Sequence, residues 1–423
     1  MGAPYAGEIR LLAPEGITLP ESVLFEPKHE GRRQLVARVE RPGVYRIEAM
    51  APLPRSERVL RAESNPLVCE ADIPRLRWAD LHGHSQLSDG TGTPEDYFTY
   101  ARDVAGLDAI ALTDHDHWGM RFLDSHPKMW QEIKRNVADF HEPGRFVTVL
   151  GYEWTSWIHG HRHVLYFKDD GEILSTLDPK YETPAQLWAG LRGQPALTFA
   201  HHSAGGPIST NWAYAPDPEL EPVTEIVSVH GSSESEDSPG VIYNPLRGNF
   251  VRDTLDAGYR FGFIGSGDSH DGHPGEAHIA SPGGGGLAAI FSEELSREGI
   301  RQAMKARRVY ATNGARIWLE VSVDGEPMGS TLAGSPESPP GTPELEPALQ
   351  RLQIRVVAES PLERVDLIRS GRVAEIPLEG ELDWTHERQI PRLLPGEYHY
   401  VRVIQADGGA AWSSPIYSDS PRP

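Results

Sequence analysis

The segment from residue 76 to residue 315 alternates short apolar runs with longer amphipathic runs, about seven times over. The longer runs have the length of helices. Two of them, TPEDYFTYARDVAG and TPAQLWAGLRG, begin with Thr-Pro, which suits an N-cap followed by proline at the first helical position. This alternation predicts an α/β fold, either a parallel β/α barrel or a doubly wound sheet. The predicted strands are RLRWADLH, LDAIALTDH, RFVTVLGYEW, PALTFAHH, TEIVSVH, RFGFIGSGDSH and GLAAIF, with HRHVLYF as an extra strand after the third.

The two ends of the chain differ from its middle in their sequence pattern. Both contain alternating or β-branched runs broken by Pro and Gly, such as RQLVARVERPGVYRIEAMAP and EYHYVRVIQADG, which are typical of short strands. A chain of 423 residues is long enough for two or three domains. We therefore expect an N-terminal β-rich module at 1–75, a β/α barrel at 76–315 and a C-terminal β-sandwich-like module at 316–423.

Charge and composition exclude several classes of partner. The net charge of -21 argues against nucleic acid or an anionic membrane as a general partner, because both demand a basic surface. The single cysteine, Cys69, allows neither an internal disulfide nor a thiolate metal site. The first residues lack the basic and apolar regions of a signal peptide, and no apolar run is long enough to span a bilayer. We expect a cytoplasmic protein with no membrane partner.

The histidines are concentrated in the middle of the chain, which indicates that the functional site lies there. Of the 18 histidines, 15 lie between His82 and His278, and the predicted strands repeatedly end in His, Asp or Glu. Because parallel strands of β/α folds bring their carboxyl ends to one edge, these side chains should converge on one pocket. In strand order they are His82, His84 and Asp89; Asp114 and His115; Glu153; His201 and His202; His230; Asp268 and His270.

This set of side chains is typical of a metal centre. His82 and His84 are two residues apart, so a strand would point both to the same face. Imidazole and carboxylate ligands without thiolate suit zinc, manganese or iron. About nine ligands are too many for one tetrahedral ion, so two or three divalent ions are expected, with the carboxylate of Glu153 as a bridge.

Each residue also has a plainer interpretation. A single strand-end histidine is more often structural than metal-binding, and Asp89 lies in an SDG sequence that also makes a good turn. The coincidence at six successive strand ends favours the metal centre. A further group is interpreted either as orienting the ligands or as facing the substrate: Asp114, His117, His161, His163 and His202.

The motifs DLHGHSQLSDG, ALTDHD, GYEW, FAHH, VSVH and GSGDSHDG resemble, in order, those of the polymerase and histidinol phosphatase (PHP) superfamily. The resemblance covers about residues 76–315. The segments GYEWTSWIHGHRHVLYF and DSHDGHPG bring it closer to the large PHP-like branch that includes carbamate-hydrolysing enzymes. It implies a distorted seven-stranded β/α barrel, a site for two or three metal ions, and phosphoester hydrolysis.

The resemblance also implies which residues would share each ion. Two positions depart from the family pattern: Asp89 stands where some members have histidine, and His202 follows His201 where many have proline, so His202 is an alternative ligand. The implied sets are His82, His84, Glu153 and Asp268 for the first ion, Glu153, His201 and His230 for the second, and Asp89, His115 and His270 for the third.

The expected activity is a metal-dependent hydrolysis of phosphomonoesters or phosphodiesters by a metal-bridged hydroxide, acting on a small, phosphorylated ester. Glu153, Asp268, His202 and His163 are the candidates for moving protons or holding the reacting group. One alternative is a carboxyl ester or carbamate hydrolase, in which Trp154, Trp157 and Trp212 form an aromatic pocket for a neutral substrate. A second alternative is a non-catalytic binding protein with a metal-bearing scaffold.

Overall fold

The computed structural model describes residues 5–53, 56–275, 285–333 and 348–419. The chain divides into two compact units, Met1–Pro74 and Arg75–Pro423. The segments 76–315 and 316–423, expected as separate modules, both fall in the second unit, and their separation stays a prediction. None of the helices in the described part of the chain is long and apolar enough to cross a membrane.

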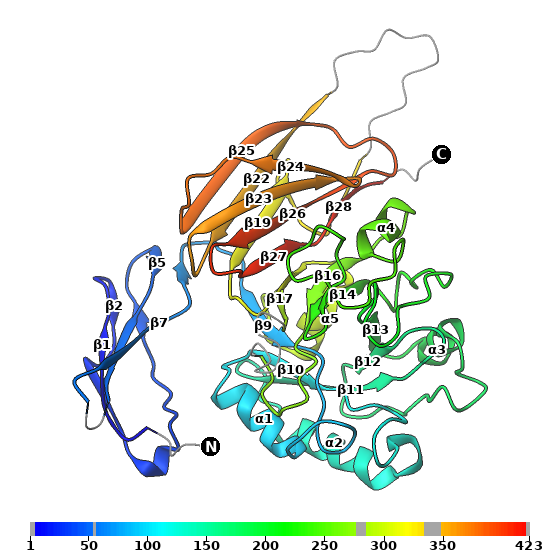
Figure 1. The fold of residues 1–423 in the computed structure, drawn as a ribbon, viewed down its shortest axis with the longest axis horizontal. Helices are drawn as coiled ribbons and strands as arrows, with labels where there is room; N and C mark the ends of the chain where they lie inside the picture. Colours follow the sequence, from blue (N-terminus) through cyan, green and yellow to red (C-terminus); the bar gives the residue numbers. More distant parts are fainter. Residues whose placement is uncertain (1–4, 54–55, 276–284, 334–347, 420–423) are drawn as a thin grey trace. The chain divides into compact units, whose positions relative to one another are not determined.

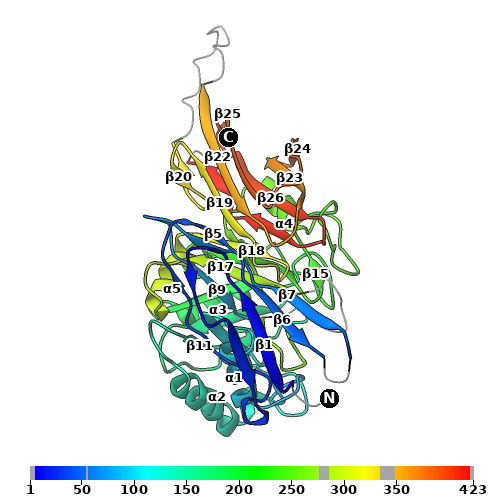
Figure 2. The same ribbon diagram turned by 90° about the vertical axis from the view of Figure 1, so that its left-hand side faces the viewer.

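The first unit consists of short strands, as its alternating sequence predicts. In β1 every second residue is exposed, which is the period of a strand with one covered face. A four-stranded sheet has the order β3-β1-β6-β7, and β2-β4 and β5-β8 form two further pairs. Figure 2 shows β1, β6 and β7 side by side. The elements are β1 (Gly7–Leu12), β2 (Ile17–Thr18), β3 (Ser22–Phe25), the 3-10 helix η1 (Pro27–His29), β4 (Arg38–Val39), β5 (Gly43–Tyr45), β6 (Glu48–Pro52), β7 (Val59–Glu63) and β8 (Leu67–Cys69).

The second unit is built on a large mixed sheet, so the predicted α/β class is confirmed. Strands β9, β10 and β11 are parallel neighbours, and β12 runs antiparallel between β11 and β13 as the inserted strand expected after the third. All eight residues of β11 are buried, as in a strand covered on both faces. The strands are β9 (Leu76–Asp80), β10 (Ala109–Leu112), β11 (Val147–Trp154), β12 (Arg162–Tyr166), β13 (Ala196–Ala200), β14 (Val223–Ser228), β15 (Gly231–Ser232), β16 (Gly262–Gly265), β17 (Leu287–Phe291) and β18 (Val309–Thr312).

The order of the strands in the sheet differs from the order in a simple barrel. The main sheet has 13 strands and runs β13-β12-β11-β10-β9-β17-β18 before it continues into C-terminal strands. Strand β17 is antiparallel to β9, and β14 and β16 pair in parallel in a separate three-stranded sheet with β15. A closed seven-stranded barrel therefore stays a prediction.

Helices cover the parallel part of the sheet, and their starts follow the sequence signals. Thr93 and Thr183 each accept a hydrogen bond from a backbone N–H in the first turn, and a proline follows each of them, as Thr-Pro predicts. Helix α2 was not among the predicted helices. Figure 1 shows α1 and α2 lying below β10 and β11. The helices are α1 (Pro94–Asp103), α2 (Pro127–Asp139), α3 (Pro184–Leu191), α4 (Val251–Asp256) and α5 (Arg297–Lys305), with the 3-10 helix η2 (Leu123–Ser125) before α2.

The C-terminal strands form two layers around their own apolar core. The sheet β20-β19-β22-β25 lies against the strands β23, β24 and β26 of the main sheet (Figure 2). Leu319, Val356 and Val401, one from each of three strands, are fully buried between them. The strands are β19 (Trp318–Val323), β20 (Glu326–Pro327), β21 (Thr331–Leu332), β22 (Leu349–Val357), β23 (Leu362–Arg369), β24 (Arg372–Ile376), β25 (Asp383–Pro391), β26 (Tyr398–Gln405), β27 (Ala410–Ser413) and β28 (Ile416–Ser418).

Candidate metal centre

His82 and His84 lie just beyond β9 and point to the same side, as their two-residue spacing predicts. The backbone N–H of His84 donates to the carbonyl of Ser269, which extends the strand past its last regular residue. The Nε2 atoms of the two imidazoles are 3.2 Å apart. Gly83 between them is required, because a Cβ there would lie 2.3 Å from the hydroxyl of Tyr97.

Two buried carboxylates face this pair. Oε2 of Glu153, in β11, lies 3.4 Å from Nε2 of His82 and 3.2 Å from Nε2 of His84. Oδ1 of Asp268, in the loop after β16, lies 3.0 and 3.3 Å from the same two nitrogens. Asp268 has a φ of 53°, in the left-handed region that non-glycine residues rarely adopt. The backbone is thus held in an unfavourable conformation at the residue whose carboxylate reaches the histidines.

The second oxygen of Asp268 faces a different pair of histidines. Its Oδ2 lies 2.8 Å from Nε2 of His230, after β14, and 3.7 Å from Nε2 of His201, after β13. The carboxylate therefore lies between the His82–His84 pair and the His201–His230 pair. One oxygen is turned to each.

A third group lies on the other side of His84, closer to solvent. Nδ1 of His84 is 3.6 Å from Oδ1 of Asp89. The other oxygen of Asp89, Oδ2, is 3.8 Å from Nε2 of His115 and 3.4 Å from Nε2 of His270. The rings of His115 and His270 both stack on His84. The nine residues expected as ligands thus converge on one place.

The residues expected around the ligands differ in their contacts. Nδ1 of His161 is 2.6 Å from Oε1 of Glu153, and the ring of His163 lies 3.8 Å from the ring of His82, centre to centre. The ring of His202 lies 3.7 Å from that of His201, but its nitrogens join none of the close groups of potential ligand atoms among the described residues.

Asp114 and His117 have other roles. Asp114 accepts hydrogen bonds from the hydroxyls of Ser85 and Ser88 and from the backbone of Ser85, so it holds the loop between His84 and Asp89. His117 contacts the neighbouring carboxylate of Asp116 at 2.8 Å. Neither belongs to the close groups of potential ligand atoms in the described chain.

The carboxylates of the cluster are held in their charged form. Burial alone would raise the pKa values of Glu153 and Asp268, but the surrounding histidines outweigh it and lower both well below their usual range. Burial alone would lower the pKa of His82, yet the charges of Asp268 and Glu225 raise it well above its usual value. The ionised carboxylates and the charged imidazole of His82 therefore stabilise one another.

Three histidines of the cluster are held neutral instead. Burial is the chief cause that keeps the pKa values of His163, His201 and His202 well below the usual value, and neighbouring imidazoles lower them further. A neutral imidazole keeps a lone pair on one nitrogen, which is the form that binds a metal ion or accepts a proton.

Glu225 contacts the candidate centre, and the sequence interpretation missed it. It lies within β14, fully buried, with one carboxylate oxygen 3.0 Å from Nδ1 of His82 and the other 2.9 Å from Nδ1 of His201. Burial raises its pKa to about 7, and the charge of His82 opposes that rise. When ionised, Glu225 only accepts hydrogen bonds, so it receives them from both Nδ1 atoms and leaves both Nε2 atoms facing Asp268. Each Nε2 offers a lone pair to a metal ion once its imidazole is neutral. The available signal was a lone acid inside an apolar strand, which must find a partner.

Glu225→Gln is expected to weaken divalent-ion binding by about 10- to 100-fold while the protein stays folded. The glutamine amide offers one oxygen acceptor and one NH₂ donor, so it cannot accept from both Nδ1–H groups, and one histidine must turn its lone pair away from the centre. Calorimetric titration with Mn²⁺ and Zn²⁺, beside circular dichroism, measures this. Unchanged affinity in the folded variant would show that Glu225 does not orient these ligands.

The donor atoms of the cluster fit a group of divalent ions. In the described residues, Oε2 of Glu153 and both carboxylate oxygens of Asp268 are buried without a hydrogen-bond partner of acceptable geometry, although histidine nitrogens lie as close as 2.8 Å. Both nitrogens of His163 and His202 and Nε2 of His161 are equally unpartnered. Buried polar atoms are normally satisfied. Oxygen and nitrogen lone pairs that converge in this way are typical of a site that holds metal ions.

The three tryptophans expected near a neutral substrate have separate places. Trp154 is fully buried, and its indole N–H donates to the carbonyl of Tyr181. Trp212 packs on Tyr259 and Phe261. Trp157 alone is both exposed and next to the cluster, with its ring 5.1 Å from that of His161.

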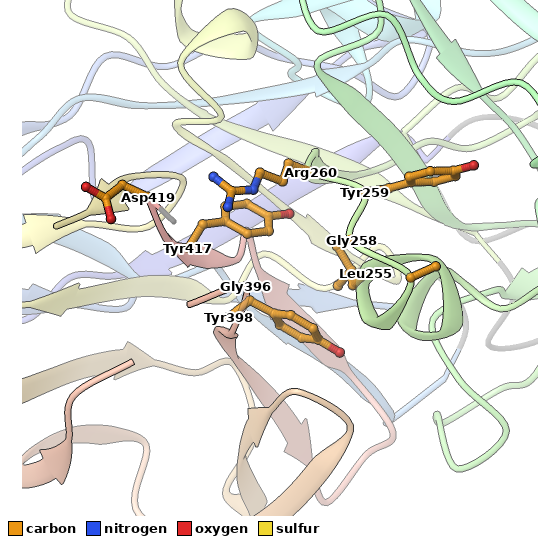
Figure 3. A pocket seen from close by; sticks show the side chains of 9 residues that line it. Leu255, Gly258, Tyr259, Arg260, Gly396, Tyr398, Tyr417 and Asp419 are labelled. Carbon is orange, nitrogen blue, oxygen red and sulfur yellow. The ribbon is translucent and has the colours of Figure 1, made fainter. Parts of the chain in front are cut away.

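A separate cavity of about 460 Å³ lies between α4 and the strand β28 (Figure 3). Its walls include Tyr259, Tyr398 and Tyr417, but each hydroxyl is already bonded within the protein, to the Trp212 carbonyl, the Asp256 carboxylate and the Phe261 carbonyl respectively. Among its described lining residues there is no cluster of reactive groups comparable to the histidines.

Known proteins similar to this chain include a family and two bacterial relatives. The model of a protein family of unknown function, DUF3604, matches residues 107–239 and 275–324. An uncharacterized protein of Chlamydia pneumoniae is 29% identical over 411 residues, covering 89% of this chain and 62% of that protein. One from Chlamydia trachomatis is 26% identical with the same coverage. The chain therefore spans 62% of the length of these relatives.

Similar solved structures are more distant. A two-domain protein of Bacteroides vulgatus, described as containing a predicted PHP-like metal-dependent phosphoesterase, is 15% identical with a TM-score of 0.44, covering 83% of this chain and 98% of that one. The lesion-specific Endonuclease Q of Pyrococcus furiosus is 13% identical with a TM-score of 0.34, covering 55% and 56%.

Proposed function

We propose that this chain is a metal-dependent hydrolase that cleaves phosphoesters. The observation that carries the proposal is the set of buried, ionised carboxylate oxygens of Glu153 and Asp268 without hydrogen-bond partners in the described residues, surrounded by histidine nitrogens. Such an arrangement is costly in a metal-free protein and becomes favourable when divalent ions occupy its centre.

The ligand sets implied by the motifs are compatible with the three groups of side chains, and two or three Zn, Mn or Fe ions would fill them. Asp268 turns one oxygen to each of two histidine pairs, so we propose it as a bridge in addition to Glu153. Asp89, His115 and His270 would hold the more exposed ion. His201 is favoured over His202 as a ligand, because Glu225 orients its ring.

Divalent ions held there would activate a water molecule and neutralise the charge that develops on the scissile group. Glu225 keeps His82 and His201 in the tautomer that binds. His202 is neutral and stands beside His201 and His230, so we propose that it accepts or returns the proton of the reaction. His163 is packed between His82 and Phe199, and it would support His82 rather than touch the substrate.

Initial rates on matched p-nitrophenyl substrates test the proposal. A phosphodiester, a phosphomonoester and an N-methyl carbamate are compared after loading with Mn²⁺ or Zn²⁺. We expect metal-dependent phosphoester cleavage that falls at least about 100-fold in His84→Ala, because that side chain contacts both carboxylates. The folded state of the variant is checked by circular dichroism.

The alternatives predict different outcomes of the same assay. Cleavage of a carbamate or carboxyl ester without phosphoester turnover would leave the metal centre in place and change the kind of bond that it hydrolyses. The exposed Trp157 beside His161 favours this second candidate. No hydrolysis by fully loaded protein would favour a binding protein. A structure of Endonuclease Q contains a 27-mer duplex substrate with an abasic lesion at the active site, but the net charge of -21 argues against a nucleic-acid substrate here.

A further inference from the structure

Two exposed tryptophans lie together beside the metal centre. Trp118 belongs to the loop after β10 and Trp157 to the loop after β11, and their rings are 5.0 Å apart, centre to centre. Their exposed fractions are 44% and 43%, so each ring is open on part of its surface. We call this pair the tryptophan platform.

The platform is continuous with the candidate centre. Oε1 of Glu153 contacts Nδ1 of His161 at 2.6 Å, and the ring of His161 meets the ring of Trp157 edge to face at 5.1 Å. One imidazole ring therefore separates the carboxylate from Trp157.

Other side chains near the platform in sequence are also apolar and exposed. Met120 is 98% and Ile158 is 72% exposed, and Phe122 lies beside His117. Such a group on a charged protein is unusual, and exposed apolar patches commonly mark binding sites. Both loops leave the carboxyl ends of parallel strands, where α/β proteins place their substrate-binding residues.

We infer that the platform binds a flat aromatic group of a small ester substrate and so selects the substrate of the neighbouring centre. The inference rests on the proposed function, because the centre supplies the reacting end. An indole face attracts a planar ring more strongly than a saturated ring of the same size. The acidic chain offers no general attraction for a polyanion, so the occupant is a small molecule rather than nucleic acid.

Binding of 2-naphthol and of decahydro-2-naphthol, its saturated analogue of similar size, tests this without any turnover. Calorimetry with the Mn²⁺-loaded full chain is expected to show at least about a fivefold lower Kd for 2-naphthol. The preference should vanish in Trp157→Leu, which keeps an apolar side chain without a ring, and persist in part in Trp157→Phe. An equal Kd for the two ligands in the unmodified protein would overturn the inference.

Hydrolysis rates on 2-naphthyl methyl phosphate and decahydro-2-naphthyl methyl phosphate separate the hydrolase proposal from the platform proposal. For each ester, the rate of Trp157→Leu is divided by the rate of the unmodified protein. Aromatic preference in binding without hydrolysis of any ester would leave the platform standing and reject the hydrolase. If both esters are hydrolysed and this rate ratio is the same for both, the platform is rejected and the hydrolase proposal stands. A changed oligomeric state of Trp157→Leu, with unchanged ligand preference, would reassign the platform to contact between copies. Trp157-dependent binding of a single-stranded DNA oligomer would reassign it to nucleic acid.

Discussion

Asp268→Asn is expected to abolish metal-dependent hydrolysis, with a loss of at least about 10³-fold in kcat/KM. The carboxylate faces two histidine pairs, and the amide keeps one neutral oxygen while it turns an NH₂ donor toward the other pair. Several kcal/mol of charge stabilisation by bound ions depend on such ligands, and each 1.36 kcal/mol is about a factor of ten in rate. Metal content by mass spectrometry and rates on the preferred p-nitrophenyl ester measure the effect together.

The matched control is Asp139→Asn, the same change at an exposed position at the end of α2. It should leave metal content and rate within about a factor of two, because surface substitutions away from special features have small effects. If Asp268→Asn kept the metal content and activity of the control, the proposed bridging role of this carboxylate would be wrong.

Arg402→Met is expected to destabilise the second unit by about 3–5 kcal/mol. Arg402 is 1% exposed in β26, and its guanidinium lies 2.9 Å from Glu234 and 2.8 Å from Asp366, which are both fully buried. Without the guanidinium, the carboxylates of Glu234 and Asp366 stay buried but lose its compensating charge. Burying a carboxylate without that charge costs much more free energy than losing an exposed ion pair. Urea unfolding followed by tryptophan fluorescence and circular dichroism measures the change.

The control here is Arg145→Met, because Arg145 is 58% exposed and pairs with Glu142 at the surface. Its unfolding free energy should change by about 1 kcal/mol at most. A loss below about 1 kcal/mol in Arg402→Met as well would mean that water reaches the buried carboxylates and replaces the arginine. Glu234 follows β15 in the loop after His230, so this ion network also ties the C-terminal layer to a segment of the candidate centre.

Local patterns in the sequence were sufficient for the main strands of the β/α segment, for the starts of two helices and for the convergence of the histidines, whereas β24 and β25 were not predicted. Thr-Pro marked the starts of α1 and α3, and the two-residue spacing of His82 and His84 placed both imidazoles on one side. These features depend on periodicity and on the rule that parallel strands end at one edge, and both can be read from neighbours in the chain. The assignment of each ligand to a particular ion stays a prediction.

Only the tertiary structure brought together residues that are distant in the chain. Glu225 meets His82 across 143 positions, and Arg402 meets Glu234 across 168. No local pattern specifies such partners, because a buried charge requires some partner without determining which. The tryptophans make the same point: Trp154 and Trp157 look alike in sequence, yet one is in the core and the other is exposed beside His161. By itself, then, the sequence determined which groups of the β/α segment converge, because strand direction follows from local alternation. Which side chains orient the histidines, and which aromatic face stays open, was decided by packing between distant segments.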